Sequence, residues 1–211
     1  MADDHAALMD SVYRYQRYIY DLTRKYYLFG RDRLIDELAP KPGARIVEIG
    51  CGTARNLIRM ARRYPNAELF GLDASEAMLE TAAKAIARAG LGGRIRLAHG
   101  YAEALAPSMF GLTQGFDEAV FSYSLSMIPD WKAALTAADA TLAPGGRVHI
   151  VDFGDLSGFA QPLRKALLAW LSLFHVAPRT ELLGTLEKSP GDFRVLTGRY
   201  AFLFHGRRKN I

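Results

Sequence analysis

The stretch VEIGCGTARNL, residues 47–57, follows an apolar run and precedes an amphipathic one. A turn between a buried strand and the start of a helix places backbone N–H groups and the positive end of the helix dipole beside whatever lies across it. The glycines at positions 50 and 52 therefore indicate a nucleotide-binding turn. The residues around them indicate which nucleotide.

Two common nucleotide-binding turns do not fit this stretch. A dinucleotide fingerprint has glycine at its first, third and sixth positions. Counting from Gly50, the third position is Gly52 but the sixth is Arg55, and no Gly-Lys-Ser/Thr sequence follows to make a P-loop. The remaining pattern is E-x-G-x-G-T over residues 48–53, with Asp73 at the end of the next apolar run. A carboxylate there can accept hydrogen bonds from both hydroxyls of a ribose.

Short apolar runs alternate with helical periodicity from residue 45 onward. Ser75 is a candidate helix N-cap, and Gly90 is placed to end the same helix. This alternation predicts a parallel sheet with helices on both faces, the doubly wound α/β fold. The pattern predicts strands at 45–50, 67–73, 94–100, 116–124 and 146–153, and helices at 54–64, 75–90 and 129–144.

The last part of the sequence has a different pattern. Residues 192–208 contain two strand-like runs around Thr197 and Gly198. These runs are too close together for a crossover helix, so we expect them to pair antiparallel. The sheet should therefore be mostly parallel and end in an antiparallel pair.

Composition favours one globular domain of 211 residues. Hydrophobic residues make up 50% of the chain and charged residues 23%, which is typical of a globular protein with a full core. The single Cys51 excludes a disulfide framework and a multi-cysteine metal site, and we expect it to be a small buried side chain. The acidic start MADDHAALMD lacks the apolar core of a secretory signal.

The C-terminal quarter is basic and partly apolar. Residues 158–211 contain nine Lys and Arg against three Asp and Glu. The apolar stretch ALLAWLSLFHVA, residues 166–177, is shorter than the roughly 20 residues needed to span a bilayer. A basic end beside an apolar helix favours an acidic partner, either anionic lipid or nucleic acid, while a solvated basic face explains the charge equally well.

An aromatic segment precedes the predicted sheet. YRYQRYIYDLTRKYYLFGRDRL, residues 13–34, carries seven aromatic residues in a helical pattern, with arginines on the opposite face. This segment is predicted to pack on the core, or to form a lid or a membrane-surface helix.

The sequence resembles the class I S-adenosylmethionine-dependent methyltransferases over residues 45 to about 153. The resemblance rests on the glycine turn, on Asp73 and on the antiparallel pair of C-terminal strands. The resemblance implies a seven-stranded sheet in the order 3-2-1-4-5-7-6 with an antiparallel last strand. It implies a single domain over 1–211, with an N-terminal helical lid at 1–38, a cofactor-binding core at 45–153, and an apolar helix plus strand pair at 156–211. The implied cofactor is S-adenosylmethionine, its product is S-adenosylhomocysteine, and no metal is expected.

The resemblance also assigns cofactor-binding residues. It places the glycine turn against the methionine portion of the cofactor, Asp73 at the ribose and Met78 at the adenine. Family members often have an acid after the third strand, where this chain has Tyr101, so either Tyr101 edges the base or Glu103 supplies the acceptor. The implied cofactor-binding residues are Glu48, Gly50, Cys51, Gly52, Thr53, Asn56, Asp73, Ala74, Met78, Gly100, Tyr101, Ala102, Ser122 and Tyr123.

A narrower resemblance concerns the substrate. The aromatic segment, FSYSLSMIPDW (121–131) and VDFGD (151–155) resemble the bacterial methyltransferases that convert diacylglycerylhomoserine to the betaine lipid diacylglyceryl-trimethylhomoserine. The soluble-type phosphatidylethanolamine N-methyltransferases, which make phosphatidylcholine, are the alternative. The resemblance implies successive methylation of a primary amine on a lipid. It also implies a cytoplasmic protein that associates peripherally with the anionic inner face of the membrane.

The residue types present suit a lipid amine. Aromatic faces stabilise a quaternary ammonium without hydrogen bonds that methylation would remove. Arg31 is the candidate partner for a head-group carboxylate, with a surface ion pair to Asp32 or Asp36 as the alternative. Asp152 is the candidate proton acceptor. The candidate aromatic residues are Tyr15, Tyr18, Tyr20, Tyr26 and Tyr123, for each of which core packing is the alternative; Tyr20 and Tyr123 are the two we expect at the reacting centre.

Two other function classes use similar sequences. The basic end would suit a nucleic-acid methyltransferase or an RNA-binding relative, but SYSL stands where a base pocket of the Asn/Asp-Pro-Pro-Tyr/Phe type would follow the fourth strand. We therefore expect no nucleic-acid partner. An oxidoreductase could be built on the same sheet. The sequence leaves the oligomeric state and the number of methyl transfers open.

Overall fold

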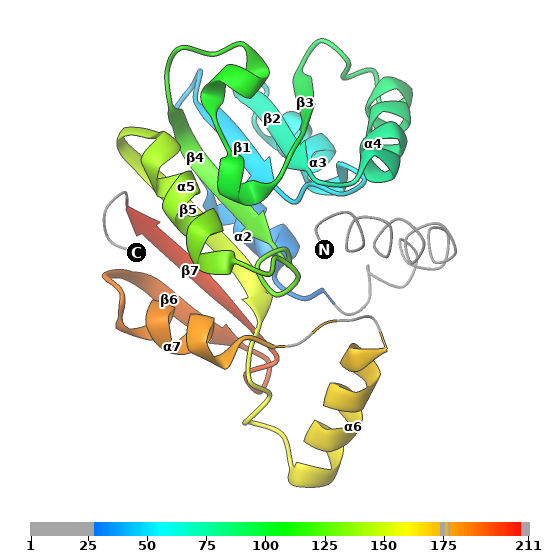
Figure 1. The fold of residues 1–211 in the computed structure, drawn as a ribbon, viewed down its shortest axis with the longest axis vertical. Coiled ribbons are helices and arrows are strands. Elements are labelled where there is room, and N and C mark those ends of the chain that lie inside the picture. The colour runs from blue at the N-terminus through cyan, green and yellow to red at the C-terminus, as the bar shows by residue number, and fades with distance from the viewer. Residues whose placement is uncertain (1–27, 174–175, 177, 208–211) are drawn as a thin grey trace.

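The computed structural model describes residues 28–173, 176 and 178–207. Seven strands form one sheet in the order β3-β2-β1-β4-β5-β7-β6 (Figure 1). All neighbours are parallel except β7, which is antiparallel to both β5 and β6. The predicted fold class and strand order are therefore confirmed. The strands are β1 Arg45–Ile49, β2 Glu68–Asp73, β3 Ile95–His99, β4 Phe116–Ser122, β5 Leu142–Phe153, β6 Gly191–Leu196 and β7 Ala201–Arg207.

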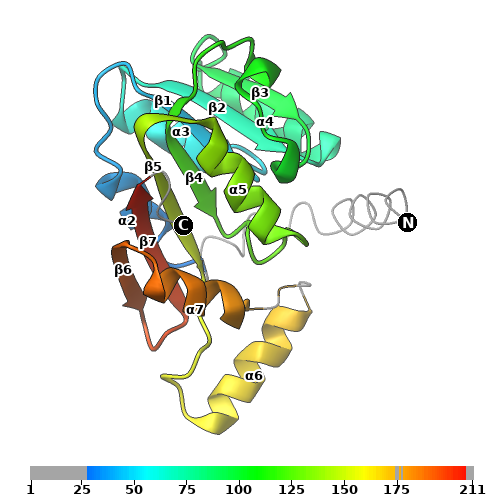
Figure 2. The ribbon, with the colours of Figure 1, turned by 60° about the vertical axis from the view of Figure 1, so that its left-hand side comes forward.

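Helices cover both faces of the sheet, and each face has its own hydrophobic cluster between sheet and helices (Figures 1 and 2). Side chains of α2, α3 and α4 pack on one face, and those of α5, α7 and the two 3₁₀ turns pack on the other. The inner strands β2, β1, β4, β5 and β7 are largely buried on both sides, which explains their apolar sequences, while the edge strands β3 and β6 are partly exposed. The helices are α2 Arg31–Glu37, α3 Arg55–Arg63, α4 Glu76–Arg88, α5 Trp131–Thr141, α6 Gln161–Ser172 and α7 Thr180–Lys188, with 3₁₀ turns η1 Ala102–Ala104 and η2 Pro107–Phe110.

Local signals placed α4 correctly. The Ser75 Oγ accepts the backbone N–H of Met78 at 3.3 Å, as an N-cap does. Gly90, with φ +70°, follows the C-terminal end of the helix. A left-handed backbone is the usual way for a helix to stop, and glycine adopts it without strain.

The helical pattern predicted over 13–34 does not run unbroken to its end. Residues 1–27, which include most of the predicted lid, lie outside the described residues. Gly30 has φ +84°, and α2 begins only at Arg31. A Cβ at Gly30 would lie 2.5 Å from Leu196 Cδ1, so this position combines a left-handed backbone with close packing on β6.

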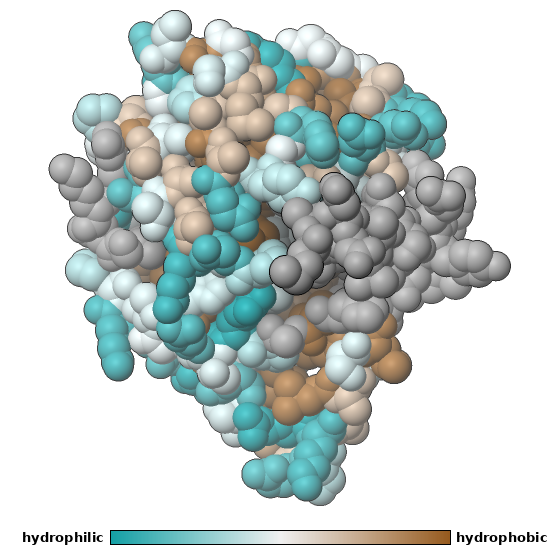
Figure 3. Space-filling view, in the orientation of Figure 1, coloured by the Kyte–Doolittle hydropathy of each residue, from teal (hydrophilic) through white to brown (hydrophobic). Residues whose placement is uncertain are grey.

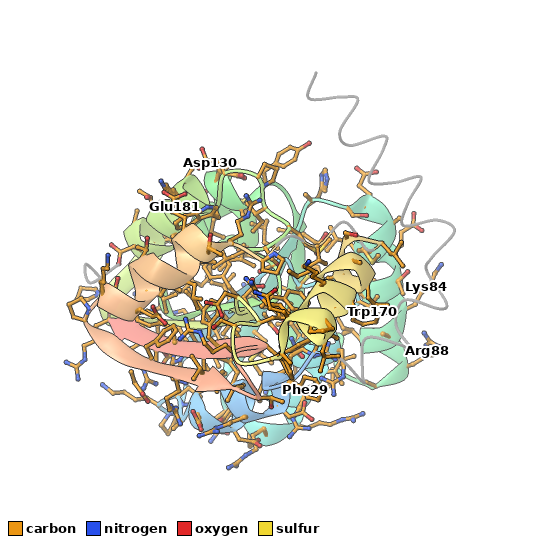
Figure 4. All side chains as sticks on the ribbon, turned by 90° about the horizontal axis from the view of Figure 1, so that it is seen from below. Phe29, Lys84, Arg88, Asp130, Trp170 and Glu181 are labelled. Carbon is orange, nitrogen blue, oxygen red and sulfur yellow. The ribbon has the colours of Figure 1, made fainter. Side chains whose placement is uncertain are left out.

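The helix α6 projects away from the sheet beyond α7 (Figures 1 and 2). Leu171 is fully buried, while Leu163 is 50% exposed and Leu173, just after the helix, is 68% exposed. Within the described residues, no helix has the length and apolar character needed to cross a membrane. Figure 4, the view from below, shows Trp170 on α6 and Phe29 just before α2.

Candidate active site

A cavity of about 370 Å³ opens at the carboxyl ends of β1, β2 and β4. Ligands of open α/β sheets bind at this edge. Every residue expected to bind the cofactor lines this cavity, and so does Arg31. The remaining lining residues are Leu28, Ile49, Arg55, Leu72, Ser75, Glu103, Ser124, Met127, Ile128 and Pro129.

The glycine turn after β1 leaves no room for a side chain. Gly50 has φ +75°, and a Cβ there would lie 2.6 Å from the Cβ of Ser124. The backbone N–H groups of Gly50 and Cys51 both donate to the Leu72 carbonyl, at 2.8 and 3.0 Å, which fixes the turn on β2. Burial raises the pKa of the Cys51 thiol well above its ordinary value, so this side chain fills space as expected.

Asp73 joins the glycine turn to the start of α4. Its Oδ2 accepts the Gly52 N–H at 2.7 Å, and its Oδ1 accepts the Ser75 N–H at 3.0 Å. The carboxylate therefore fixes the shape of the turn and also adds a negative charge to the cavity wall.

Glu48 is a buried carboxyl group with one oxygen left over. Its Oε1 accepts a hydrogen bond from Asn56 Nδ2 at 2.7 Å, while Oε2 has no hydrogen-bond partner among the described residues. Burial raises the pKa of Glu48 to about 8, against the opposing effects of Asn56 and the Arg31 charge. An ammonium group in the cavity would donate a hydrogen bond to Oε2 and favour the ionised form of Glu48.

Arg31 lies inside the protein rather than on the surface. It is 8% exposed and lines the cavity, where its charge acts on both Glu48 and Tyr123. The alternative of a surface ion pair with Asp32 or Asp36 is wrong, because those two carboxylates pair with arginines of α3. Asp32 lies 3.0 Å from Arg59 and 3.2 Å from Arg55, and Asp36 lies 3.4 Å from Arg59 and 3.9 Å from Arg63.

Tyr123 lines the cavity directly after β4. Burial raises the pKa of its hydroxyl well above the ordinary value, and the protonated hydroxyl donates to the Phe29 carbonyl at 2.6 Å. Its ring meets Phe153 edge to face, with 4.6 Å between centroids. The phenol therefore ties the segment before α2 to the loop after β4, while its ring forms part of the cavity wall.

Asp152 does not take the position expected of a proton acceptor. It is 1% exposed and lies outside the cavity lining. Its two oxygens accept the backbone N–H groups of Phe153 at 2.7 Å and Ser126 at 3.0 Å. Burial raises its pKa to about 6 against these hydrogen bonds, and the side chain holds the loop after β4. Tyr20, the second tyrosine expected at the reacting centre, lies outside the described residues.

Comparison with known proteins identifies the family. A family described as a methyltransferase domain matches residues 46–146. The ubiquinone/menaquinone biosynthesis C-methyltransferase UbiE of Syntrophotalea carbinolica is 30% identical over 182 residues, which cover 84% of this chain and 71% of that enzyme. The chain belongs to the S-adenosylmethionine-dependent methyltransferases. Its cofactor is S-adenosylmethionine, and S-adenosylhomocysteine is the product.

Other relatives of this methyltransferase are more distant or longer. The demethylmenaquinone methyltransferase of Geobacillus kaustophilus is 29% identical over 161 residues, which cover 74% of this chain and 62% of that enzyme. The apo structure of the S-adenosylmethionine-dependent methyltransferase SibL superposes with a TM-score of 0.69 at 21% identity, over 92% of this chain and 57% of SibL. The chain thus spans less than two thirds of both proteins, and the likeness to SibL supports the fold.

The cavity residues of this methyltransferase fit its cofactor. The unpartnered Glu48 Oε2 offers an acceptor to the ammonium of the cofactor's amino-acid end, and Asp73 offers a carboxylate to its ribose. Gly50 lines the cavity, and Ser124 occupies the place where a side chain at this position would lie. Tyr101, 56% exposed, and Glu103 both line the cavity at the position expected for the base.

Replacing Glu48 with glutamine should change how stability depends on pH. The pKa of Glu48 is about 8 in the folded state, above the ordinary 4.5, so the folded state holds this proton more tightly than the unfolded state does. The resulting contribution to the free energy of unfolding is fully present below pH 4.5 and is lost as pH rises to about 8. We expect the unfolding free energy of the ligand-free wild type, relative to Glu48→Gln, to fall by a few kcal/mol across that interval. Urea titrations at pH 5, 7 and 9 measure it.

The same substitution is expected to flatten the pH dependence of cofactor binding. Because an ammonium favours ionised Glu48, wild-type affinity for S-adenosylhomocysteine should rise between pH 6 and 8. If Glu48→Gln and the wild type give parallel curves in both measurements, this assignment of the buried charge is wrong.

Proposed function

We propose that this methyltransferase successively methylates the primary amine of diacylglycerylhomoserine to give the betaine lipid diacylglyceryl-trimethylhomoserine, with phosphatidylethanolamine as the alternative lipid. The buried cation at Arg31 carries the proposal, because an amino-acid head group brings a carboxylate that needs such a partner. Phe29, two residues earlier, is bonded to Tyr123, so Arg31 is placed on the β4 side of the cavity, across the glycine turn from Asp73.

The chemistry requires little beyond position and the exclusion of water. The cofactor supplies an electrophilic methyl group on a sulfonium, and no acid, base or metal is needed for the displacement itself. The chain binds the head group through Arg31, faces the developing cation with the Tyr123 ring, and limits water with Leu28, Ile128 and Pro129.

A second candidate comes from the relatives, whose names describe methylation of carbon in quinone biosynthesis. Transfer to an aromatic carbon requires the loss of a proton from the ring, so it benefits from a general base near the reacting atoms. Among the residues that the structure describes, no histidine lines the cavity, and Asp152 is occupied by backbone groups. The lining carboxylates Glu48, Asp73 and Glu103 are those expected at the cofactor. These observations favour the amine.

A labelling experiment separates these substrates. The purified chain is incubated with methyl-deuterated S-adenosylmethionine and vesicles containing diacylglycerylhomoserine, phosphatidylethanolamine or a demethylated polyprenyl quinol. We expect up to three labelled methyl groups on the nitrogen of diacylglycerylhomoserine, measured by mass spectrometry. Label on phosphatidylethanolamine alone would select the alternative lipid, and label on the quinol carbon would overturn the proposal.

We further propose that α6 docks the enzyme on an anionic membrane from the cytoplasmic side. Leu163 and Leu173 expose apolar surface on this projecting helix, and Lys165 is exposed between them. Figure 3 shows apolar surface near α6, at the bottom of that view. The net positive charge of residues 158–211, with nine basic and three acidic side chains, favours binding to an anionic membrane.

The double variant Leu163→Asp/Leu173→Asp should lose membrane binding. We expect roughly tenfold less protein to float with vesicles containing anionic lipid, because two apolar contacts are replaced by charges of the wrong sign. Val195→Asp is the control, since Val195 is 46% exposed and lies on β6 rather than on α6. Equal flotation of both variants and the wild type would contradict membrane docking through α6.

A further inference from the structure

Two serines at the carboxyl end of β4 carry buried hydroxyl groups that the fold does not use. The Oγ atoms of Ser122 and Ser124 are buried, and neither has a hydrogen-bond partner among the described residues. Both side chains line the cavity, and Ser124 is only 6% exposed. A buried hydroxyl without a partner lowers stability, so these groups call for an explanation outside the fold itself.

The backbone between the two serines is strained and firmly held. Tyr123 has φ +57°, which is unusual for a residue with a bulky side chain. Its N–H donates to the Val151 carbonyl at 2.8 Å, its hydroxyl donates to Phe29, and Asp152 accepts the N–H of Ser126. Strain maintained by so many contacts, between two cavity-lining serines whose hydroxyls have no partner among the described residues, indicates a binding role.

The position of the serines along the sheet edge indicates the ligand. Asp73 ends β2, the glycine turn follows β1, and Ser122 ends β4 with Ser124 just beyond it, in the spatial order β2-β1-β4. Ser124 is packed on Gly50, on the side of the turn away from Asp73. A nucleoside whose sugar is held at Asp73 therefore leaves both serines to the second substrate. Ser122, which the resemblance assigns to the cofactor, is reassigned to the substrate on this ground.

We propose that the hydroxyl oxygens of Ser122 and Ser124 accept the N–H groups of the substrate amine and so direct its lone pair toward the methyl group. This inference rests on the proposed amine substrate. In each transfer the nitrogen lone pair forms the N–CH₃ bond while the S–CH₃ bond breaks and its electron pair stays on sulfur. The resulting ammonium loses one proton to water before the next transfer.

The number of available N–H groups falls at every step. A neutral primary amine has two, the monomethyl amine has one and the dimethyl amine has none. The two serines can therefore orient the first nucleophile fully, the second in part and the third not at all. Orientation of the third would rest on the aromatic and apolar wall of the cavity.

The test measures kcat/KM of the wild type, Ser122→Ala, Ser124→Ala and the double variant on the primary, monomethyl and dimethyl forms of the lipid. For the double variant we expect roughly a hundredfold loss on the primary amine, tenfold on the monomethyl amine and less than twofold on the dimethyl amine. Ser122→Thr keeps a hydroxyl and should restore most of the activity lost in Ser122→Ala. Ser108→Ala, an exposed serine on η2, is the control.

Two further readouts separate this role from a structural one. Both alanine variants should keep or raise the melting temperature, since each removes an unpaired buried hydroxyl, and both should bind S-adenosylhomocysteine as the wild type does. Equal losses on all three amines, or a weakened affinity for S-adenosylhomocysteine, would overturn the inference while leaving the proposed function intact. No turnover of any of the amines by the wild type would overturn both.

Discussion

Gly50→Ala is expected to lower the affinity for S-adenosylhomocysteine at least a hundredfold while the chain still folds. The left-handed backbone at φ +75° costs a residue with a Cβ about 1–2 kcal/mol. The added Cβ also lies 2.6 Å from the Cβ of Ser124, which is too close to the backbone to rotate away. The loop after β4 must therefore shift, and the cavity changes shape where the cofactor's amino-acid end is expected. Calorimetric titration measures the affinity.

Gly43→Ala is the matched control for this variant. Gly43 has φ +79°, so alanine meets the same backbone strain, but a Cβ there contacts nothing within 4 Å and the residue lies outside the cavity. We expect a similar loss from strain alone, about 1 kcal/mol, with unchanged affinity for S-adenosylhomocysteine. If Gly50→Ala binds as tightly as Gly43→Ala, the close fit of the glycine turn has no role in binding.

Asp73→Asn is expected to weaken binding of S-adenosylhomocysteine by about a hundredfold. The carboxylate already accepts the N–H groups of Gly52 and Ser75, and its charge strengthens any further bond to a ribose hydroxyl. An amide turns one acceptor into a donor, so it must lose either the bond to the turn or a bond to the sugar. Loss of one or two charge-assisted hydrogen bonds, at about 1.5–3 kcal/mol each, gives an effect of this size.

Asp117→Asn serves as the control at the opposite end of the same sheet. Asp117 accepts the backbone N–H of Arg45 at 2.8 Å at the start of β1, far from the carboxyl ends of the strands. We expect this variant to lose stability through the same kind of hydrogen bond and to keep its affinity for S-adenosylhomocysteine. Equal affinities of Asp73→Asn and the wild type would remove Asp73 from the cofactor site.

The sheet could be predicted from the sequence because most of its strands and helices have a local sequence signal. Periodicity alone placed β1 through β4, Ser75 placed the start of α4, and the short spacing around residues 197–198 predicted the antiparallel pair. The helix α7, Thr180–Lys188, was not predicted separately, because it follows closely on the apolar stretch of α6. The break at Gly30 depends on packing against Leu196, which is remote in sequence.

Residue types gave the composition of the cavity but not the use of each side chain. Glu48, Asp73 and Arg31 were expected from motif positions and all line one cavity. Asp152 was expected to take a proton, but only the folded loop reveals that backbone N–H groups occupy both of its oxygens. The place of Ser124 after the fourth strand predicts that it faces cofactor or substrate, but its burial and its contact with Gly50 depend on the fold.

A crystal structure of the chain with S-adenosylhomocysteine tests the central claim most directly. We predict the ribose hydroxyls on Asp73, the ammonium of the amino-acid end on Glu48, and the sulfur on the side of Ser124. Nucleoside density elsewhere would contradict this, for example in the second cavity, of about 430 Å³, lined by Arg45, Pro107, Gln114, Gly115, Ala140, Thr141, Leu142, Ala143 and Pro144 at the other end of the sheet.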